Sequence, residues 1–423
     1  MSILLNILGI VLLLGGLYLV SSNRKEVNKK LILKAFIIQF IIAFLLVKFP
    51  LGRFALQKVS DIVTNILSYG AEGLSFVFGG LANSNASTGS IFGIQVLGNI
   101  IFVSSLVAAL YYLGVIGFVV KGIGGLIGNI LGTSKVESFV AVANMFLGQT
   151  ESPILVSKYL GGMTESEIML VLISGMGSMS ATVLMGYTSM GIPMEYLLIG
   201  GALVPFGSII VSKLIIPENI RVAKSETIVN TDGSTSLSEA SLAITSTIDE
   251  VTIDNKGDNA NLIDAISQGA MDGLNMVLGI GASLIAIISL VALVNGALGI
   301  FGVSLEQIFS DIFAPIGFLM GIPREHILTA SELLGSKLIL NEFIAFGELG
   351  KILSTLDYRT GLMMTISLCG FANISSMGMC ISGISVFCPE KRGHLAKLAF
   401  RGMIGGFCVS VLSALIVGLI AAI

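Results

Sequence analysis

The sequence predicts an all-α protein that crosses a membrane many times. Of its 423 residues, 54% are hydrophobic and 12% are charged, whereas an ordinary soluble domain carries about 25% charged residues. The mean hydropathy is +0.95. Apolar segments of roughly 20 residues, the length that a spanning helix needs, recur along the whole chain. Two apolar stretches are interrupted by a glutamate, Glu151 in one and Glu342 in the other.

Eight apolar segments predict membrane-spanning helices. We interpret the first as a retained helix, because it lacks the basic start and the small-residue cleavage site of a signal peptide. The eight predicted spans are residues 3–20, 32–49, 94–117, 168–187, 194–216, 274–298, 361–386 and 402–423.

Four other apolar regions fit a full span less well. Residues 53–85 and 304–320 carry charged side chains at helical spacing, so we expect amphipathic helices at the membrane interface. Residues 134–160 and 327–350 contain the two glutamates. We expect these two regions to form re-entrant helical hairpins.

Basic residues predict the orientation, because lysine and arginine gather in loops that stay in the cytoplasm. The first and last loops are both basic, and eight spans with the first loop inside place both termini outside the cytoplasmic membrane. The hydrophilic insert 217–260 then lies in the cytoplasm. We expect a solvated linker there, with a regulatory or docking loop as the alternative. The basic residues are Arg24, Lys25, Lys29, Lys30, Lys391, Arg392, Lys397 and Arg401.

The two glutamates belong to segments with the same order of elements. Each precedes a short polar loop and then a helix rich in glycine and hydroxyl residues. Such a helix frees backbone carbonyls, which persist at membrane depth only when they line protein or a cavity, or bind a ligand. A buried carboxylate there usually faces a partner, a cavity or a transported solute. Broken helices near the bilayer midplane build the sites of secondary transporters, so we predict a transporter with an inverted-repeat core.

The predicted organisation has five parts. They are 1–133, scaffold helices with an interfacial helix and the third span; 134–216, the first hairpin and broken helix; 217–260, the hydrophilic loop; 261–326, a scaffold span and an interfacial helix; and 327–423, the second hairpin and broken helix.

The residue types of the predicted cavity describe its ligand. Amides and hydroxyls offer neutral donors and acceptors, ionised glutamates offer strong acceptors, and Phe371 offers an aromatic face. No arginine lies beside these motifs, which argues against a phosphate or carboxylate ligand. The set fits a small neutral solute with several hydroxyl or amide groups and a flat apolar part. The polar residues are Gln149, Thr150, Glu151, Glu342, Asn373 and Ser376.

Other classes of protein fit less well. The net charge of −3 argues against a nucleic-acid partner. The chain has no CxxC motif, and His326 and His394 are far apart in sequence, which argues against a zinc site. It has no HExxH or GxSxG motif and no histidine beside either glutamate, which argues against an intramembrane enzyme. A channel would need a repeated filter sequence that is not found. The alternative for each glutamate is a structural pair with Lys158 or Lys337.

Several motifs resemble those of the concentrative nucleoside transporters, and the resemblance covers nearly the whole chain. It implies an inner-membrane symporter that imports nucleosides with sodium or protons. It also implies eight spans, two hairpins, interfacial helices, a homotrimer and an elevator-type motion of a transport domain against a scaffold. The motifs are residues 148–153 (GQTESP), 334–338 (LGSKL), 341–343 (NEF), 369–376 (CGFANISS) and 389–392 (PEKR).

The resemblance also implies a role for each site residue. The base would meet Gln149, Thr150, Glu151 and Val183, the ribose hydroxyls would meet Glu342, Asn373 and Ser376, and Phe371 would pack against both. Sodium would bind the side chains of Asn144 and Ser178 and the carbonyls of Leu147 and Met179.

Oxygen ligands fit a hard cation, so we favour sodium over protons and expect no other cofactor. The alternative is a proton-coupled nucleoside or nucleobase carrier of the same fold. Ser152 departs from the alanine that is commoner in the family, which puts the base preference in doubt.

Overall fold

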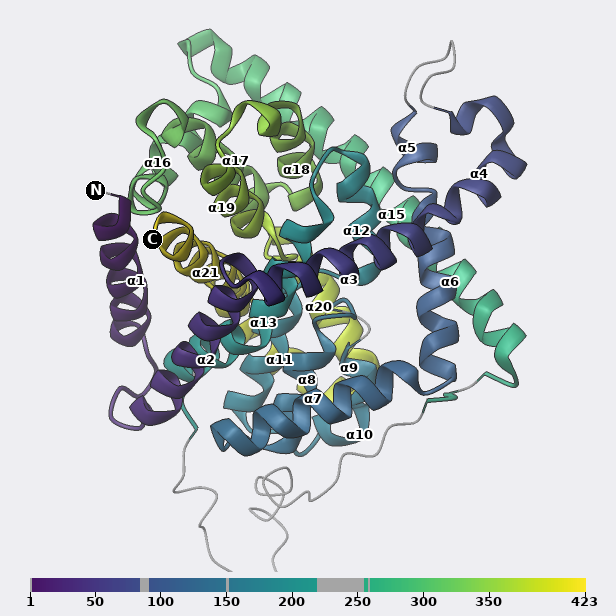
Figure 1. The fold of residues 1–423 in the computed structure, drawn as a ribbon, viewed down its shortest axis with the longest axis horizontal. Helices are drawn as coiled ribbons and strands as arrows, with labels where there is room; N and C mark the ends of the chain where they lie inside the picture. The colour runs from purple at the N-terminus through teal and green to yellow at the C-terminus, as the bar shows by residue number, and fades with distance from the viewer. Residues whose placement is uncertain (1, 84–90, 150–151, 219–254, 258) are drawn as a thin grey trace, which may run out of the picture.

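The prediction of an all-α protein is confirmed. The computed structural model describes residues 2–83, 91–149, 152–218, 255–257 and 259–423, and within these ranges it contains helices and no strand (Figure 1). Thr150 and Glu151 lie outside the described residues, as does most of the insert 217–260.

The N-terminal third of the chain forms helices α1 to α7. In α3 the buried residues Leu56, Ser60 and Leu67 lie on one face, which confirms the predicted amphipathic pattern. The helices are α1 (Ser2–Leu19), α2 (Lys29–Val47), α3 (Pro50–Ser68), α4 (Gly70–Phe78), α5 (Phe92–Gln95), α6 (Asn99–Tyr112) and α7 (Val115–Leu131).

The segment that is predicted to form the first repeat follows directly. Two of its helices begin with a capping box, in which Ser134 and Thr164 each bond reciprocally with a glutamate three residues later. Its helices are α8 (Lys135–Ala143), α9 (Ser152–Leu155), α10 (Ser157–Leu160), α11 (Glu165–Gly177), α12 (Ala181–Ser189) and α13 (Met194–Ile215).

The second half begins with the longest helix, α15, which packs along α6. Gly269 and Gly273 allow this approach, because a Cβ atom at either would lie 3.0 Å or less from backbone atoms of α6. The helices are α15 (Leu262–Leu298), α16 (Leu305–Leu319), α17 (Ile327–Ile339), α18 (Glu342–Ile352), α19 (Tyr358–Leu368), α20 (Ile374–Phe387) and α21 (Arg392–Ala422).

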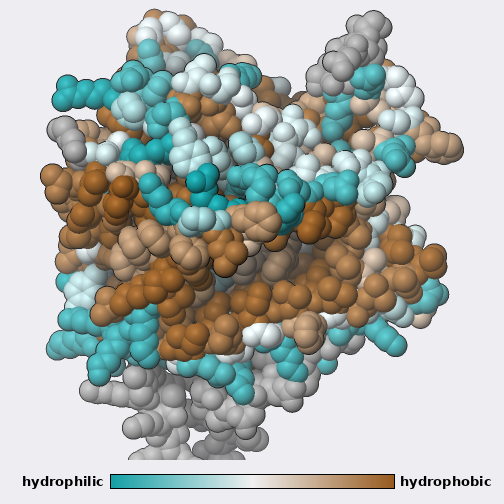
Figure 2. Space-filling view, viewed as in Figure 1, coloured by the Kyte–Doolittle hydropathy of each residue, from teal (hydrophilic) through white to brown (hydrophobic). Residues whose placement is uncertain are grey.

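The core lies around α21, which packs against α1, α11, α13 and α19. Gly406 lets α21 approach the end of α11, since a Cβ atom there would lie 2.9 Å from the backbone nitrogen of Gly177. Outside this core, hydrophobic side chains form a band across the middle of the molecule, with hydrophilic groups gathered above and below it (Figure 2). This pattern is expected of a protein that sits in a bilayer.

Within the described residues, seven helical segments are long and apolar enough to cross a membrane. The predicted span 361–386 is instead two shorter helices, α19 and α20, separated by an unwound segment. The predicted span 94–117 ends early, because Gly114 adopts a left-handed conformation (φ 78°) and starts α7 in a new direction. The apolar helix α7 was not predicted.

The two chain ends lie on the same side of the molecule, near the ends of α1 and α21 (Figure 1). The connection between α1 and α2 and the exit from α13 lie on the opposite side. This arrangement agrees with an even number of crossings. Which side faces the cytoplasm stays a prediction from the basic loops.

Candidate functional site

The first half of the site is a break between α11 and α12. The helix α11 ends at Gly177, and Ser178 is extended (φ −106°, ψ 170°). Helix α12 then begins with Ser180 as its N-cap, whose hydroxyl accepts a hydrogen bond from the Thr182 amide at 3.3 Å. Serine favours this break because its side chain can satisfy the amides at the start of a new helix.

The second half is the break between α19 and α20. Helix α19 ends at Leu368, and Asn373 caps α20 by accepting a hydrogen bond from the Ser376 amide at 2.9 Å. Gly370 lies between them with φ 98°, a conformation that side chains with a Cβ atom rarely adopt. The glycine- and polar-rich stretch therefore unwinds the helix, as its sequence predicts.

The two breaks contact each other. The Phe371 amide donates a hydrogen bond to the carbonyl of Ser178 at 3.1 Å. A Cβ atom at Gly370 would lie 2.6 Å from the carbonyl oxygen of Gly177, so the two chains pass with no room for a side chain. The repeats are thus joined through their unwound backbone.

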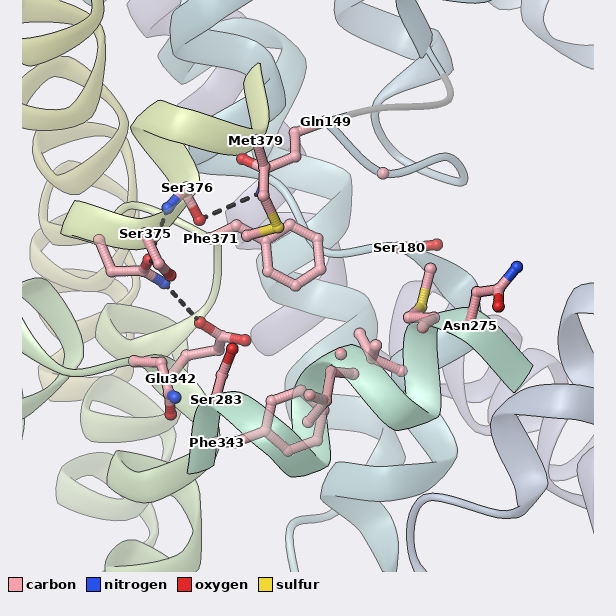
Figure 3. Close-up of a pocket in the computed structure, with 17 residues that line it drawn as sticks. Gln149, Ser180, Asn275, Ser283, Glu342, Phe343, Phe371, Ser375, Ser376 and Met379 are labelled. Carbon is pink, nitrogen blue, oxygen red and sulfur yellow. Dashed lines mark hydrogen bonds between the residues drawn. The ribbon is translucent and has the colours of Figure 1, made fainter. Parts of the chain in front are cut away.

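A cavity of about 390 Å³ lies beside this contact (Figure 3). This volume falls within the range of small-molecule sites. Six of the eight predicted substrate residues line it, and the other two, Thr150 and Glu151, lie outside the described residues. The six are Gln149, Val183, Glu342, Phe371, Asn373 and Ser376.

Glu342 is the buried carboxylate of the cavity, with 3% of its surface exposed. It lies in the first turn of α18, where the partial positive charge of the helix end favours an anion. Its carboxylate accepts hydrogen bonds from the Tyr187 hydroxyl at 3.2 Å and the Asn373 amide at 3.0 Å. No described lysine or arginine lies within ion-pair distance of it, so the alternative of a Lys337 pair is wrong.

Gln149 connects the segment between α8 and α9 to α20. Its amide nitrogen donates to the Ser376 hydroxyl at 3.1 Å, and its amide oxygen accepts from the Cys380 thiol at 3.3 Å. Figure 3 shows the Phe371 ring in the cavity between Gln149 on one side and Glu342 on the other. Amide, carboxylate and aromatic groups from both repeats therefore face one hollow.

The predicted cation residues belong to the first break, which contains Ser178 and Met179, and to the segment after α8, which contains Asn144 and Leu147. The Asn144 amide nitrogen donates to the Val140 carbonyl at 3.2 Å and to the Ser174 hydroxyl at 2.9 Å. Its buried oxygen has no hydrogen-bond partner among the described residues. Ser178, Leu147 and Met179 are buried as well.

The segment that carries Asn144 and Leu147 packs along the first break. The Ala181 amide donates to the Phe146 carbonyl at 2.9 Å, and a Cβ atom at Gly148 would lie 3.3 Å from Ser180. A buried oxygen without a donor costs free energy unless something satisfies it. A sodium ion binds oxygen atoms and would satisfy the Asn144 oxygen, so Asn144 fits the predicted ion.

Helix α15 supplies a wall of the cavity that the sequence analysis did not predict. Asn275, Gly279 and Ser283 line the cavity at intervals of four residues, and Met276 and Ile280 lie beside them. This spacing places them on one helical face. The sequence feature that could have indicated this wall is the presence of polar Asn275 and Ser283 within an apolar span. Tyr187 was also missed, because its contact with Glu342 joins positions 155 residues apart.

The Ser283 hydroxyl is directed into the cavity on the side of Glu342 (Figure 3). Replacing Ser283 with alanine should weaken ligand binding about fivefold, because one hydrogen bond contributes about 1 kcal/mol. Isothermal titration calorimetry of the purified protein measures this change. Ser289→Ala is the matched control, since Ser289 is an exposed serine of α15 that does not line the cavity. Equal affinities in the two variants would remove Ser283 from the site.

Three family models match consecutive parts of the chain. Their descriptions are "Na+ dependent nucleoside transporter N-terminus" for residues 8–81, "Nucleoside recognition" for residues 93–194 and "Na+ dependent nucleoside transporter C-terminus" for residues 196–418. Together they match most of the chain from residue 8 to residue 418.

Relatives and solved structures match over the full length. The nucleoside permease NupC of Helicobacter pylori is 35% identical over 434 residues, which covers 99% of this chain and 98% of the permease. The structure of CNTnw in an inward-facing substrate-bound state is 34% identical, with a TM-score of 0.88 over 100% of this chain and 99% of that one. A CNTnw variant in an outward-facing state has 34% identity and a TM-score of 0.90 over the same shares.

Proposed function

Because this chain belongs to the concentrative, sodium-dependent nucleoside transporter family, we propose that it imports nucleosides across the cytoplasmic membrane as a sodium-coupled symporter. The family membership makes it a multi-pass membrane transporter and not an enzyme. The coupling ion, the direction and the substrate binding residues are parts of the proposal. The observation that carries it is the joint cavity of Gln149, Glu342, Phe371, Asn373 and Ser376.

The cavity divides into two chemical halves that match a nucleoside. Glu342 and Asn373 are the strong acceptor and the amide that would bind ribose hydroxyls, with Ser376 beside them. Gln149, Val183 and the hairpin tip would meet the base, and Phe371 would pack between the two halves. A solute without the hydroxyls would leave Glu342 buried with unused hydrogen-bonding capacity, so the site discriminates strongly.

Sodium would couple to the nucleoside through the first hairpin. Asn144 and Gln149 lie on one short segment between α8 and α9. Sodium held by Asn144, Leu147, Ser178 and Met179 would order that segment and so position Gln149 for the base. Coupling requires that sodium and the nucleoside favour the same conformation of the protein. The segment between α8 and α9 would meet this requirement, because it carries residues for both ligands.

Alternating access would occur by an elevator-type motion. The two repeats, 134–216 and 327–423, would carry the cavity, while 1–133 and 261–326 would form the static scaffold. The inward- and outward-facing states of CNTnw show that a protein of this fold adopts both access states. Exposed apolar residues of α15, such as Ile285 and Leu293, fit contact with lipid or with other copies in a homotrimer.

Replacing Asn144 with alanine should reduce the apparent sodium affinity at least tenfold, because it removes a buried side-chain oxygen beside the first break that has no donor among the described residues. The sodium dependence of uridine uptake measures this change. Asn99→Ala is the control, since Asn99 is an equally buried amide whose oxygen also has no partner among the described residues. An unchanged sodium dependence of uptake in Asn144→Ala would show that the coupling ion does not bind at Asn144.

Binding competition tests the substrate class. Labelled uridine should bind the purified protein in sodium, and unlabelled nucleosides should displace it far better than free uracil or ribose. Displacement by uracil alone at equal concentration would instead identify a nucleobase carrier. Uridine binding that depends on pH but not on the sodium concentration would identify a proton-coupled carrier.

A further inference from the structure

Another buried ionisable residue, Lys337, lies outside the cavity. This residue is fully buried on the last turns of α17, in the hairpin that carries Glu342. Its ammonium group donates to the carbonyls of Ser367 at 2.9 Å and Cys369 at 2.7 Å, and to the Ser410 hydroxyl at 2.6 Å. An ammonium group has three N–H donors, and here three oxygens receive them.

The two carbonyls that accept from Lys337 lie at the end of helix α19. Ser367 and Cys369 lie where α19 ends and the second break begins. Carbonyls at a helix end lack partners within the helix and carry partial negative charge. No described carboxylate lies within ion-pair distance of Lys337. Its direct contacts are therefore these dipoles, the Ser410 hydroxyl and the Phe407 ring, whose centroid lies 5.7 Å away, while Glu342 attracts the charge from a longer distance.

The first repeat has a different group in the matching place. Asn144 ends α8, the first helix of the first hairpin, as Lys337 lies near the end of α17, the first helix of the second. Both side chains reach the end of the helix that precedes a break, Asn144 through Ser174 and Lys337 through Ser367 and Cys369. Asn144 presents an unpartnered oxygen, whereas Lys337 presents a positive charge.

We propose that Lys337 is a tethered cation that does for the second repeat what a sodium ion does for the first. This inference rests on the proposed function. The ammonium group binds the end of α19 and so holds the segment from Cys369 to Asn373 unwound, in the position where Asn373 meets Glu342. Lys337 is a positioning residue, and the second break needs no dissolved ion.

Chemical rescue tests the tethered charge. Lys337→Ala should weaken uridine binding at least about tenfold, because two helix-end carbonyls lose their donor. Millimolar methylammonium should restore binding in this variant and should leave Asn144→Ala unchanged. Lys351→Ala is the control, since Lys351 is an exposed lysine of the same hairpin paired with Glu348. Uridine affinity in Lys337→Ala equal to that of the control, or a loss that no alkylammonium reverses in a monodisperse protein, would overturn the proposal.

A second measurement uses the unaltered protein and does not depend on the variant folding. Simultaneous uptake of labelled sodium and labelled uridine into proteoliposomes gives the coupling ratio. A single dissolved-ion site predicts about one sodium ion per uridine. A ratio of about two would overturn the tethered-cation proposal while leaving sodium-coupled transport intact. Absence of uridine uptake with sodium would instead refute the proposed function.

Discussion

Replacing Glu342 with glutamine is expected to reduce nucleoside uptake by about a hundredfold, because hydrogen bonds to a charged group contribute about 1.5–3 kcal/mol each. The carboxylate accepts hydrogen bonds from Tyr187 and Asn373 and would also accept from the ribose hydroxyls when the substrate binds. A glutamine keeps the shape but offers one acceptor oxygen and adds an NH₂ donor. The initial rate of labelled uridine uptake in proteoliposomes measures the loss.

Glu348→Gln is the matched control for this variant. Glu348 lies on the same helix, but it is exposed and pairs with Lys351 at the surface. Exposed ion pairs contribute little, so its uptake should equal that of the unaltered protein. Uptake by Glu342→Gln within twofold of the control, at equal protein incorporation, would exclude Glu342 from the substrate site.

Replacing Gly370 with alanine is expected to abolish uptake. The φ of 98° is costly for alanine, and the new Cβ atom would lie 2.6 Å from the Gly177 carbonyl. The two breaks must then separate, which displaces Phe371 from the Ser178 carbonyl and disrupts both the substrate and the ion site. Uridine uptake and the sodium-induced shift in thermal stability should both be lost.

The matched control for this variant is Gly378→Ala. Gly378 lies in the regular helix α20, where an added Cβ atom would meet nothing within 4 Å. Alanine favours a helix by about 1 kcal/mol over glycine, so this variant should be at least as stable as the unaltered protein. Normal uptake by Gly370→Ala would show that the breaks do not need their close approach.

Much of the site could be predicted because its chemistry is local. A glycine and hydroxyl cluster breaks a helix through its own backbone and side chains, so the breaks near Ser178 and Gly370 follow from short sequence windows. Glu342 and Asn373 stand out as polar groups in apolar surroundings. The family resemblance then assigned them to one site, and the structure brings them within hydrogen-bond distance.

The parts that were missed depend on contacts between distant segments. Tyr187 looks like an ordinary aromatic residue of an apolar helix until α12 is placed beside α18. Ser283 lines the cavity only because α15 runs along it, which hydropathy does not report. The break before α7 depends on a single left-handed glycine, Gly114, inside a continuous apolar stretch. The contacts of Lys337 are also between distant segments, because its partners are two backbone carbonyls and the Ser410 hydroxyl and not the carboxylate that its sequence position suggests.

Sodium-driven accumulation of nucleoside is the central claim, and uptake into proteoliposomes measures it most directly. Labelled uridine and adenosine are supplied outside, with an inward sodium gradient, with equal sodium on both sides, or with an inward proton gradient alone. We predict that at least one nucleoside accumulates above its external concentration with the sodium gradient and only equilibrates without it. Accumulation driven by protons alone, or equilibration of both nucleosides under every gradient, would contradict the account.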